Sequence, residues 1–371
     1  GSRRWRGDRD AWKETLRPYL KWRIVAMLML GFASGLPLMM VFSKLSFWLR
    51  EVGIDRSVIG GFYAVSLAYS LKVLWAPVVD RVALPGLTRR LGQRRSWMML
   101  AIAGAACGLF IIGASDPATA LWPTVAGALL LAYSGATLDI AVDAWRIESA
   151  PNDEQANMAA VYILGYRFAI MFAGFGMVIA DATSWFIAYT VMTGAMLAIG
   201  ALVLRIREPA GHARTPGADL PLLKRMRAAV VEPFWQILAR FGPWLLPVMG
   251  IVALYRLSDF TMGVMASPFY VDLGYASGTV GWITGLFGPW PVVLGGFLGG
   301  FIAVRFSLMP ALLVGGVITL LTNGAFALLA MMAGPELDLA AAGVEGASVA
   351  TPPVAALFVV ILADNLAAGF V

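Results

Sequence analysis

The chain has 371 residues, of which 60% are hydrophobic and only 13% are charged. A soluble domain is about half apolar and about one-quarter charged, so this composition excludes a soluble globular protein and indicates one built for a lipid bilayer. Basic residues in a membrane protein orient the chain and contact anionic lipid headgroups. These roles explain the net charge of +6, so the charge does not indicate nucleic-acid binding. A lone Cys107 and a lone His212 support neither a disulfide nor a metal site.

About ten apolar segments are long enough for helices that cross ~30 Å of hydrocarbon. They lie near residues 24–49, 57–79, 97–115, 121–145, 157–181, 184–204, 243–270, 279–303, 308–333 and 353–371. We expect an all-α polytopic protein with a basic tail (1–23), a six-helix bundle (24–204), a linker (205–241) and about four further spans (242–371). Because the last segment stops inside an apolar run, we expect the second bundle to be incomplete in this chain.

Lysine and arginine residues indicate the orientation of the chain. They concentrate in residues 1–23, in the loop after the second span, and in residues 205–241. The loops of the opposite side carry mainly acidic residues such as Asp272, with Arg50 and Arg56 as exceptions. Because cytoplasmic loops are enriched in Lys and Arg, we expect the N-terminus and the linker to be cytoplasmic.

A weak internal repeat relates the two halves. Residues 47–61 (FWLREVGIDRSVIGG) and 269–282 (FYVDLGYASGTVGW) each contain two aromatics, a charged residue, a Gly, and a Ser or Thr before an apolar span. Together with the linker, the repeat favours the parallel-repeat design of secondary transporters, whose binding site lies at the midplane between the halves. Glycines four residues apart, such as Gly281 and Gly285, predict close helix contacts.

Two carboxylates, Asp139 and Asp143, interrupt the fourth apolar span one helical turn apart. Ionised groups near the bilayer centre cost at least ~2.5 kcal/mol each, so they usually face the bundle interior and are paired. Lys72 and Arg167 lie at a similar depth in their own spans, so we expect both to cluster with Asp139. We expect Asp143 on the same helix face, closer to the cytoplasm.

The second half also places polar groups in apolar spans: Arg256 and Asp259 in the seventh, and Asp364 and Asn365 in the tenth. Charged groups in both halves that face one cavity suit a polar solute better than a lipid. A desolvated acid beside a cation can lose and regain its proton, so we expect the carboxylate pair of the fourth span to carry proton coupling. A static ion pair that locks helices together is the alternative, with more weight for Asp143.

Five motifs follow one another within the first six spans. They are GFASGLPL (31–38), YSLKVLWAPVVDR (69–81), LGQRRSW (91–97), GATLDIAVDAWRIE (135–148) and ILGYRF (163–168). In this order and spacing they resemble the AmpG muropeptide permeases of the major facilitator superfamily, while the second half is similar chiefly at Asp364 and Asn365. The resemblance implies two bundles related by a pseudo-two-fold axis. It also implies a bacterial inner-membrane, proton-driven importer of anhydromuropeptides that serves peptidoglycan recycling and, in some bacteria, β-lactamase induction.

The resemblance also implies roles for individual residues. The charged or polar motif positions of the family fall on Lys72, Asp80, Arg81, Asp139, Asp143, Arg146, Tyr166 and Arg167. A cytoplasmic gate with charge pairs is expected from Asp80 and Arg81, followed by Arg94 and Arg95, and with Arg146. Two positions depart from the family: Leu138 replaces a common Gln, and Lys44 replaces a neutral residue. We expect Lys44 to snorkel to the membrane interface, with the guidance of a substrate carboxylate as the alternative.

A sugar-peptide substrate requires aromatic faces, amide and hydroxyl partners, and a cation for its carboxylates. The candidate substrate-binding residues are Trp48, Tyr69, Lys72, Tyr166, Arg167, Arg256, Asp259, Asp364 and Asn365. Aromatic residues in membrane spans are, however, more often packing or interfacial residues.

Two other classes of function stay open. One is a related transporter of acetyl-CoA or another anionic metabolite, and the other is a non-transporting membrane sensor or scaffold whose buried charges are structural. The sequence has no nucleophile motif and no phosphate-binding loop, so we predict neither an enzyme nor an ATP-driven pump. We expect no cofactor, no metal and a monomer whose partners are its small-molecule substrate, protons and the lipid bilayer.

Overall fold

The structure is a computed structural model that describes residues 22–209, 235, 238–334, 337 and 349–370. These residues form helices and no strand. The α-helices are α2 Trp22–Met39, α3 Leu45–Glu51, α4 Arg56–Phe62, α5 Leu67–Leu71, α6 Ala76–Arg81, α7 Leu87–Leu91, α8 Gln93–Ala114, α9 Leu121–Ser149, α10 Asn152–Ala182, α11 Trp185–Val203, α13 Leu245–Asp272, α14 Ser277–Trp282, α15 Pro289–Phe306, α16 Leu308–Ala333 and α18 Val354–Phe370. Short π or 3-10 turns are η2 Met40–Lys44, η3 Tyr63–Ser66, η4 Lys72–Leu74, η5 Gly242–Trp244 and η6 Ile283–Phe287.

The long helices follow the apolar segments of the sequence. Within the described residues, 8 helices or joined helices are long and apolar enough to cross a bilayer, beginning with Trp22–Glu51 and ending with Met309–Ala333. The seventh segment forms α13, and the tenth forms the 17-residue helix α18. Most of the predicted tail and linker lie outside the described residues, so those domain boundaries stay predictions.

The second predicted span, at 57–79, is not one continuous helix. It is divided into α4, η3, α5, η4 and α6. Pro77 has no backbone N–H and therefore starts a new helix more readily than it continues one, and it lies in the first turn of α6. Trp75 holds the preceding turn against α9, because its Nε1 donates to the hydroxyl of Thr137 at 3.2 Å. The break places Lys72 on a turn that faces α9.

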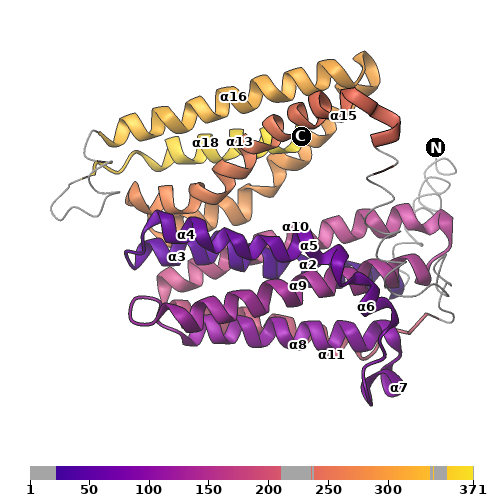
Figure 1. Cartoon of the computed structure of the whole chain (residues 1–371). Helices are drawn as coiled ribbons and strands as arrows, with labels where there is room; N and C mark the ends of the chain where they lie inside the picture. Colours follow the sequence, from indigo (N-terminus) through magenta and orange to yellow (C-terminus); the bar gives the residue numbers. More distant parts are fainter. Residues whose placement is uncertain (1–21, 210–234, 236–237, 335–336, 338–348, 371) are drawn as a thin grey trace, which may run out of the picture.

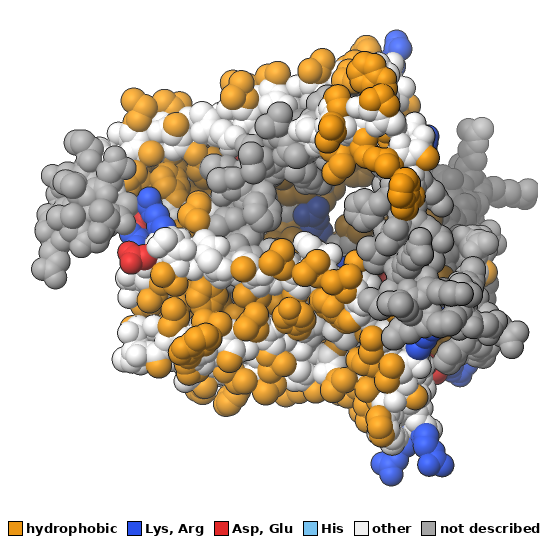
Figure 2. Space-filling view, in the orientation of Figure 1, with side chains coloured by type: hydrophobic (Ala, Val, Ile, Leu, Met, Phe, Trp, Pro, Cys, Tyr) orange, Lys and Arg blue, Asp and Glu red, His pale blue; other side chains and the backbone are white. Residues whose placement is uncertain are grey.

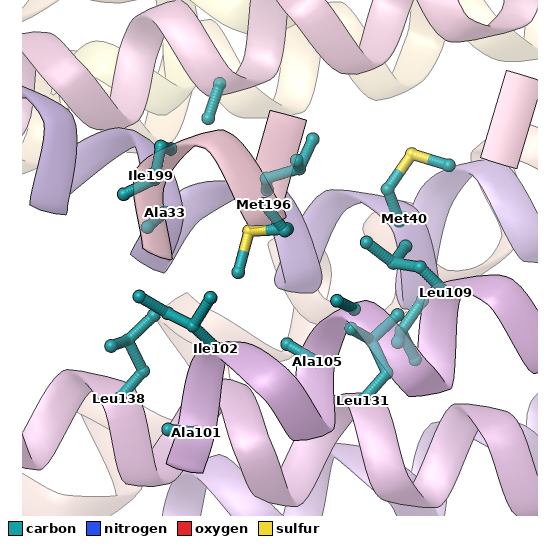
Figure 3. Packing of buried hydrophobic residues seen from close by; sticks show 14 of the residues in the cluster. Ala33, Met40, Ala101, Ile102, Ala105, Leu109, Leu131, Leu138, Met196 and Ile199 are labelled. Carbon is teal, nitrogen blue, oxygen red and sulfur yellow. The ribbon is translucent and has the colours of Figure 1, made fainter. Parts of the chain in front are cut away.

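Figure 1 shows two groups of helices, with α2 to α11 in one and α13 to α18 in the other. In the first group, α8 packs between α9 and α11, and α2 packs against α9 and α10. In the core of this group, small and long apolar side chains pack between one another. They include the buried residues Ala33, Ile102, Leu138 and Met196 (Figure 3). In the second group, α18 packs between α15 and α16.

The two sequence repeats form equivalent turns, one after α3 and one after α13. Gly53 and Gly274 end these helices with φ of 85° and 79°, a left-handed conformation that glycine adopts without steric cost. In both turns the glycine N–H donates to the carbonyl three residues earlier, and the next N–H donates to the carbonyl five residues earlier. Both turns therefore end their helices with the same hydrogen-bond pattern, which is a common one for helix ends.

The halves contact each other where α10 packs on α14 and η6, and where α3 packs on α13. Gly174 of α10 faces Gly281 and Gly285, and a Cβ on any of the three would lie within 3.0 Å of the opposite backbone. The sequence prediction of close contacts at these glycines is thereby confirmed. Away from the contacts, the molecule is hollowed between the two groups, and Lys or Arg side-chain atoms are visible inside the hollow (Figure 2).

Candidate functional site

The centre of the first half holds an ion pair between Asp139 of α9 and Lys72 of η4. The Lys72 Nζ atom lies 3.2 Å from Oδ2 of Asp139. The hydroxyl of Tyr162, on α10, donates to the other carboxylate oxygen at 3.4 Å. The side chain of Asp139 is 15% exposed and that of Lys72 is 36% exposed, so the pair is sheltered on its acidic side and open on its basic side. The sequence prediction that these two residues meet is confirmed.

Two tyrosines expected at the site lie close to this pair. The Tyr69 hydroxyl packs on Gly135, one helical turn before Asp139, where an added Cβ would lie 2.2 Å from the oxygen. The Tyr166 ring packs on Gly35 of α2, where an added Cβ would lie 3.0 Å from the ring. The Tyr69 hydroxyl is buried and has no hydrogen-bond partner among the described residues. Buried polar groups are rarely unpaired, so this hydroxyl is suited to bind water or a solute.

Arg167 does not join the pair. An α-helix turns by about 100° per residue, so Tyr162 and Tyr166 share one face of α10, while Arg167 lies about 140° away from Tyr162. Arg167 instead lines a groove of about 370 Å³ between α10, α15 and α18. The expected cluster of three charged residues is therefore corrected to a pair, with Arg167 on the surface where the two halves meet.

Asp143 and Arg146 pair with each other on α9. The Arg146 Nη2 atom lies 3.4 Å from Oδ1 of Asp143, three residues earlier. Asp143 shares the helix face of Asp139, as four-residue spacing predicts, but its side chain is 48% exposed. Arg146 was expected in the gate and instead contacts Asp143, because the gate residues project from a different side of α9.

The gate motif forms a buried charge network around Arg94. Its Nη1 lies 2.7 Å from Oδ1 of Asp80, and its Nη2 lies 2.5 Å from Oε1 of Glu148. The arginine therefore ties α6, α8 and α9 together at one end of the first half. The pairing of Asp80 with Arg94 follows the sequence expectation, and Arg81 is the last residue of α6. The sequence reasoning did not single out Glu148, although it is the last residue of the motif at 135–148.

A second acid missed from the sequence, Glu208, caps the start of α8. Its two carboxylate oxygens accept from the backbone N–H groups of Arg94 at 2.7 Å and Arg95 at 3.1 Å, which satisfies donors that a helix start leaves free. Gly92 permits this approach, since an added Cβ would lie 2.4 Å from the Glu208 side chain. Arg95 donates to the carbonyls of Val203 and Leu204 at the end of α11. A cavity of about 730 Å³ lies beside this cap, outside the contact between the halves.

At the other end, three charged residues join the two halves directly. The Arg50 Nε atom donates to Oδ1 of Asp272 at 2.6 Å, and Arg56 donates to Oδ2 of the same carboxylate. The Asp272 side chain is 3% exposed. Ser43 and Ser267 also lie within hydrogen-bond distance across the halves, 3.3 Å apart. In the sequence, the signal for this cluster was that Arg50 and Arg56 belong to loops that otherwise carry mainly acidic residues.

The remaining expected substrate contacts have mixed outcomes. Trp48 is buried against Trp185, with ring centroids 5.5 Å apart and 15° between the planes, so it packs the core and offers no free face. Asn365 donates to the Ile361 carbonyl of its own helix at 2.8 Å, and Asp364 lies beside it on α18. The side chains of Arg256 and Asp259 lie outside the described part of the structure.

Lys44 does not snorkel to the membrane interface as expected. Its residue surface is 4% exposed, and it lies at the end of the π turn η2, inside the long first span. Its Nζ donates to the hydroxyl of Thr284 in the second half, at 3.5 Å. The packing of η2 against the second half covers the path that the side chain would take to the lipid surface.

A two-bundle helical fold with charged residues inside it and at both of its ends defines a membrane transporter. The chain matches the Major Facilitator Superfamily over residues 24–370. A bacterial homologue of the human lysosomal transporter Spinster, solved in an inward-facing and unoccupied conformation, has the same fold, with a TM-score of 0.58 and 15% identity. That match covers 95% of this chain and 74% of the other.

Two relatives identify the family within this superfamily. Transporter AmpG 4 of Rickettsia conorii is 32% identical over 82% of this chain and 73% of its own length. The anhydromuropeptide permease of Escherichia coli K12 is 31% identical over 85% of this chain and 62% of its own length, so this chain spans less than two-thirds of that relative. The chain therefore belongs to the AmpG family of transporters within the major facilitator superfamily.

Proposed function

We propose that this protein imports anhydromuropeptides from the periplasm into the cytoplasm together with protons, by alternating access, for peptidoglycan recycling. The observation that supports the proposal most is the ion pair of Asp139 and Lys72, which joins two elements inside an apolar bundle. Burial raises the free energy of an ionised carboxylate that has no partner, whereas a nearby cation lowers that free energy. An acid whose cation moves away during the transport cycle therefore takes up a proton, and releases it when the cation returns.

The chemistry around this pair suits a sugar-peptide. Lys72 presents a cation on the open side of the pair, and the hydroxyls of Tyr69 and Tyr162 lie nearby. Hydroxyl groups are good partners for sugars, and a charge-assisted bond suits a carboxylate. We expect the sugar to dominate recognition, so that the anhydro-disaccharide without a peptide is transported and a free tripeptide is rejected.

Uptake into proteoliposomes tests the proposal. Labelled anhydromuropeptide is expected to accumulate inside vesicles when an inwardly directed proton gradient is imposed, and to equilibrate without accumulation when the gradient is collapsed. Unlabelled anhydro-disaccharide is expected to compete, and free tripeptide is not. Competition by acetyl-CoA but not by the disaccharide would indicate a transporter of anionic metabolites, and absence of any uptake would argue for a sensor or scaffold.

A further inference from the structure

Lys44 is a buried cation at the contact between the two halves. It is 4% exposed and ends the π turn η2, which interrupts the regular helix between α2 and α3. In the second half, α13 packs against η2, and the Lys44 side chain reaches a second π turn, η6, which carries Thr284. Single π turns inside helices frequently occur at functional sites. The Lys44 ammonium therefore links a π turn of one half to a π turn of the other.

The ammonium of Lys44 is poorly paired in this conformation. The 3.5 Å separation from the Thr284 oxygen is long for a hydrogen bond, and that hydroxyl also donates to the Val280 carbonyl at 2.8 Å. Within the described residues, no carboxylate lies within ion-pair distance of Lys44. Asp272, a described acid of the second half at this end, has both oxygens occupied by Arg50 and Arg56.

Such a site is costly unless an anion fills it at some stage of the cycle. A buried charge without a counter-charge is strongly disfavoured, and intramembrane charges that persist usually mark a substrate or ion path. When the halves separate at this end, Thr284 moves away with the second half while Lys44 stays with the first. The ammonium then borders the opened space between the halves, where a solute carboxylate can reach it.

We propose that Lys44 binds a peptide carboxylate of the transported muropeptide and thereby sets the preference for peptide-bearing over peptide-free substrates. The inference rests on the proposed function. A lysine ammonium is a compact point charge with three donors, and charge-assisted hydrogen bonds to carboxylates are about twice as strong as neutral ones. Lys44 is a specificity residue in this scheme, distinct from the pair of Lys72 and Asp139.

Transport kinetics of two substrates test the assignment. In proteoliposomes, Lys44→Met is expected to raise the KM for anhydro-disaccharide tripeptide about tenfold, which corresponds to about 1.4 kcal/mol at 25 °C. The same variant is expected to leave the KM for the anhydro-disaccharide without a peptide unchanged. Lys44→Arg keeps the charge and is expected to retain the preference for the peptide-bearing substrate. Thr284→Val removes the hydroxyl partner of Lys44 but keeps the cation, so any change in KM is expected to be equal for the two substrates and the preference to be retained.

A second measurement needs no substitution. Esterifying the peptide carboxylates is expected to lower the affinity of the unaltered protein at least about tenfold, and that of Lys44→Met by a smaller factor. An equal change for both substrates in Lys44→Met, or no change for either, would overturn the role of Lys44 while leaving the proposed function standing. If the unaltered protein transports neither substrate, the proposed function fails and this inference fails with it.

Discussion

At the level of single residues, the immediate surroundings of a charge decide what that charge can do. Asp139 and Asp143 lie one turn apart on the same face of α9, yet their environments differ. Asp139 is sheltered and bonded to Lys72 and Tyr162, whereas Asp143 is about half exposed and paired with Arg146 on its own helix. A sheltered acid with a partner on another element responds to helix movement, and an exposed acid with a partner on the same helix does not. We therefore propose that Asp139, and not Asp143, carries the proton coupling.

The substitution Asp139→Asn is expected to abolish proton-driven accumulation. The amide has nearly the same shape as the carboxylate. Its oxygen can accept from Lys72 while its NH2 group donates to the Tyr162 hydroxyl oxygen, so the protein is expected to fold. Because an amide cannot take up a proton, accumulation is expected to fall to the level measured without a gradient, while exchange of labelled for unlabelled substrate continues. Uptake assays in proteoliposomes measure both quantities.

The matched control is Asp143→Asn, which removes a charge from the same face of the same helix. It is expected to keep at least about half of the normal accumulation, because the exposed pair with Arg146 contributes little. Full accumulation by Asp139→Asn would remove this residue from the coupling mechanism. Equal loss in the two variants would show that the number of acids on α9 matters more than their surroundings.

At the level of helices, close backbone contacts position the site. α2 and α10 approach so closely that a Cβ on Gly165 would lie 2.0 Å from the Leu28 carbonyl oxygen, and one on Gly31 would lie 2.2 Å from the Tyr162 carbonyl oxygen. Small residues allow this approach, which lets dispersion forces and weak hydrogen bonds hold helices together in lipid. The same contact fixes the height of α10, and therefore places the Tyr162 hydroxyl at Asp139.

Gly165→Ala is expected to destabilise the protein. The obstructing atom is backbone and cannot rotate away, so α2 and α10 must separate, at an expected cost of about 1 to 3 kcal/mol. Gly194→Ala on α11 is the control, since an added Cβ there meets nothing within 4 Å and alanine favours a helix. Thermal unfolding in detergent, followed by size-exclusion fluorescence, is expected to show a lower Tm for the first variant only. Equal Tm values would mean that the helices are less tightly packed than described.

At the level of the whole molecule, the two ends of the transporter are built differently. The Asp80, Arg94 and Glu148 network lies within the first half. The cluster of Arg50, Arg56 and Asp272 joins the first half to the second. Figure 1 shows the halves side by side at the end with α3 and α4, and further apart toward the end with α6 and α7. Alternating access would require the joined end to open.

A disulfide across the joined end is expected to block transport. Ser43 and Ser267 belong to different halves and their hydroxyl oxygens are 3.3 Å apart, so cysteines at both positions are close enough to react. In a Cys107→Ser background, oxidation of the double variant Ser43→Cys with Ser267→Cys is expected to abolish uptake, and reduction to restore it. Each single variant serves as a control. Undiminished uptake by the fully cross-linked protein would show that this end need not open.

The membrane orientation is tested by cysteine labelling in the same background. The positive-inside rule predicts that His212→Cys, in the linker, reacts with an impermeant maleimide only after cells are permeabilised. Ala118→Cys, an exposed position in the loop between α8 and α9, is expected to react in intact cells. The reverse pattern would invert the topology, and with it the direction proposed for transport.

The sequence by itself determined the class of protein, the approximate positions of the apolar spans, the internal repeat and the similar depth of Lys72 and Asp139. These features depend on local properties: apolar length, glycine conformation, and the depth of each residue along a helix of known rise. Helical spacing alone also placed Asp139 and Asp143 on one face. The five motifs of the first half carried the family assignment, because their residues lie in one order along the chain.

Only the tertiary structure decided which helix faces meet. The orientation of α10 about its own axis directs Arg167 away from Asp139 and toward the groove with α15 and α18. Packing against Trp185 buries Trp48. The partners Glu148, Glu208 and Asp272 come from other parts of the chain, so no local pattern could show which groups they contact. The burial of Lys44 likewise requires the second half to lie against η2. The depth of a residue along its helix follows from its position in the sequence. The direction in which its side chain points and the residue that it contacts depend on how the helices pack, and the site requires both.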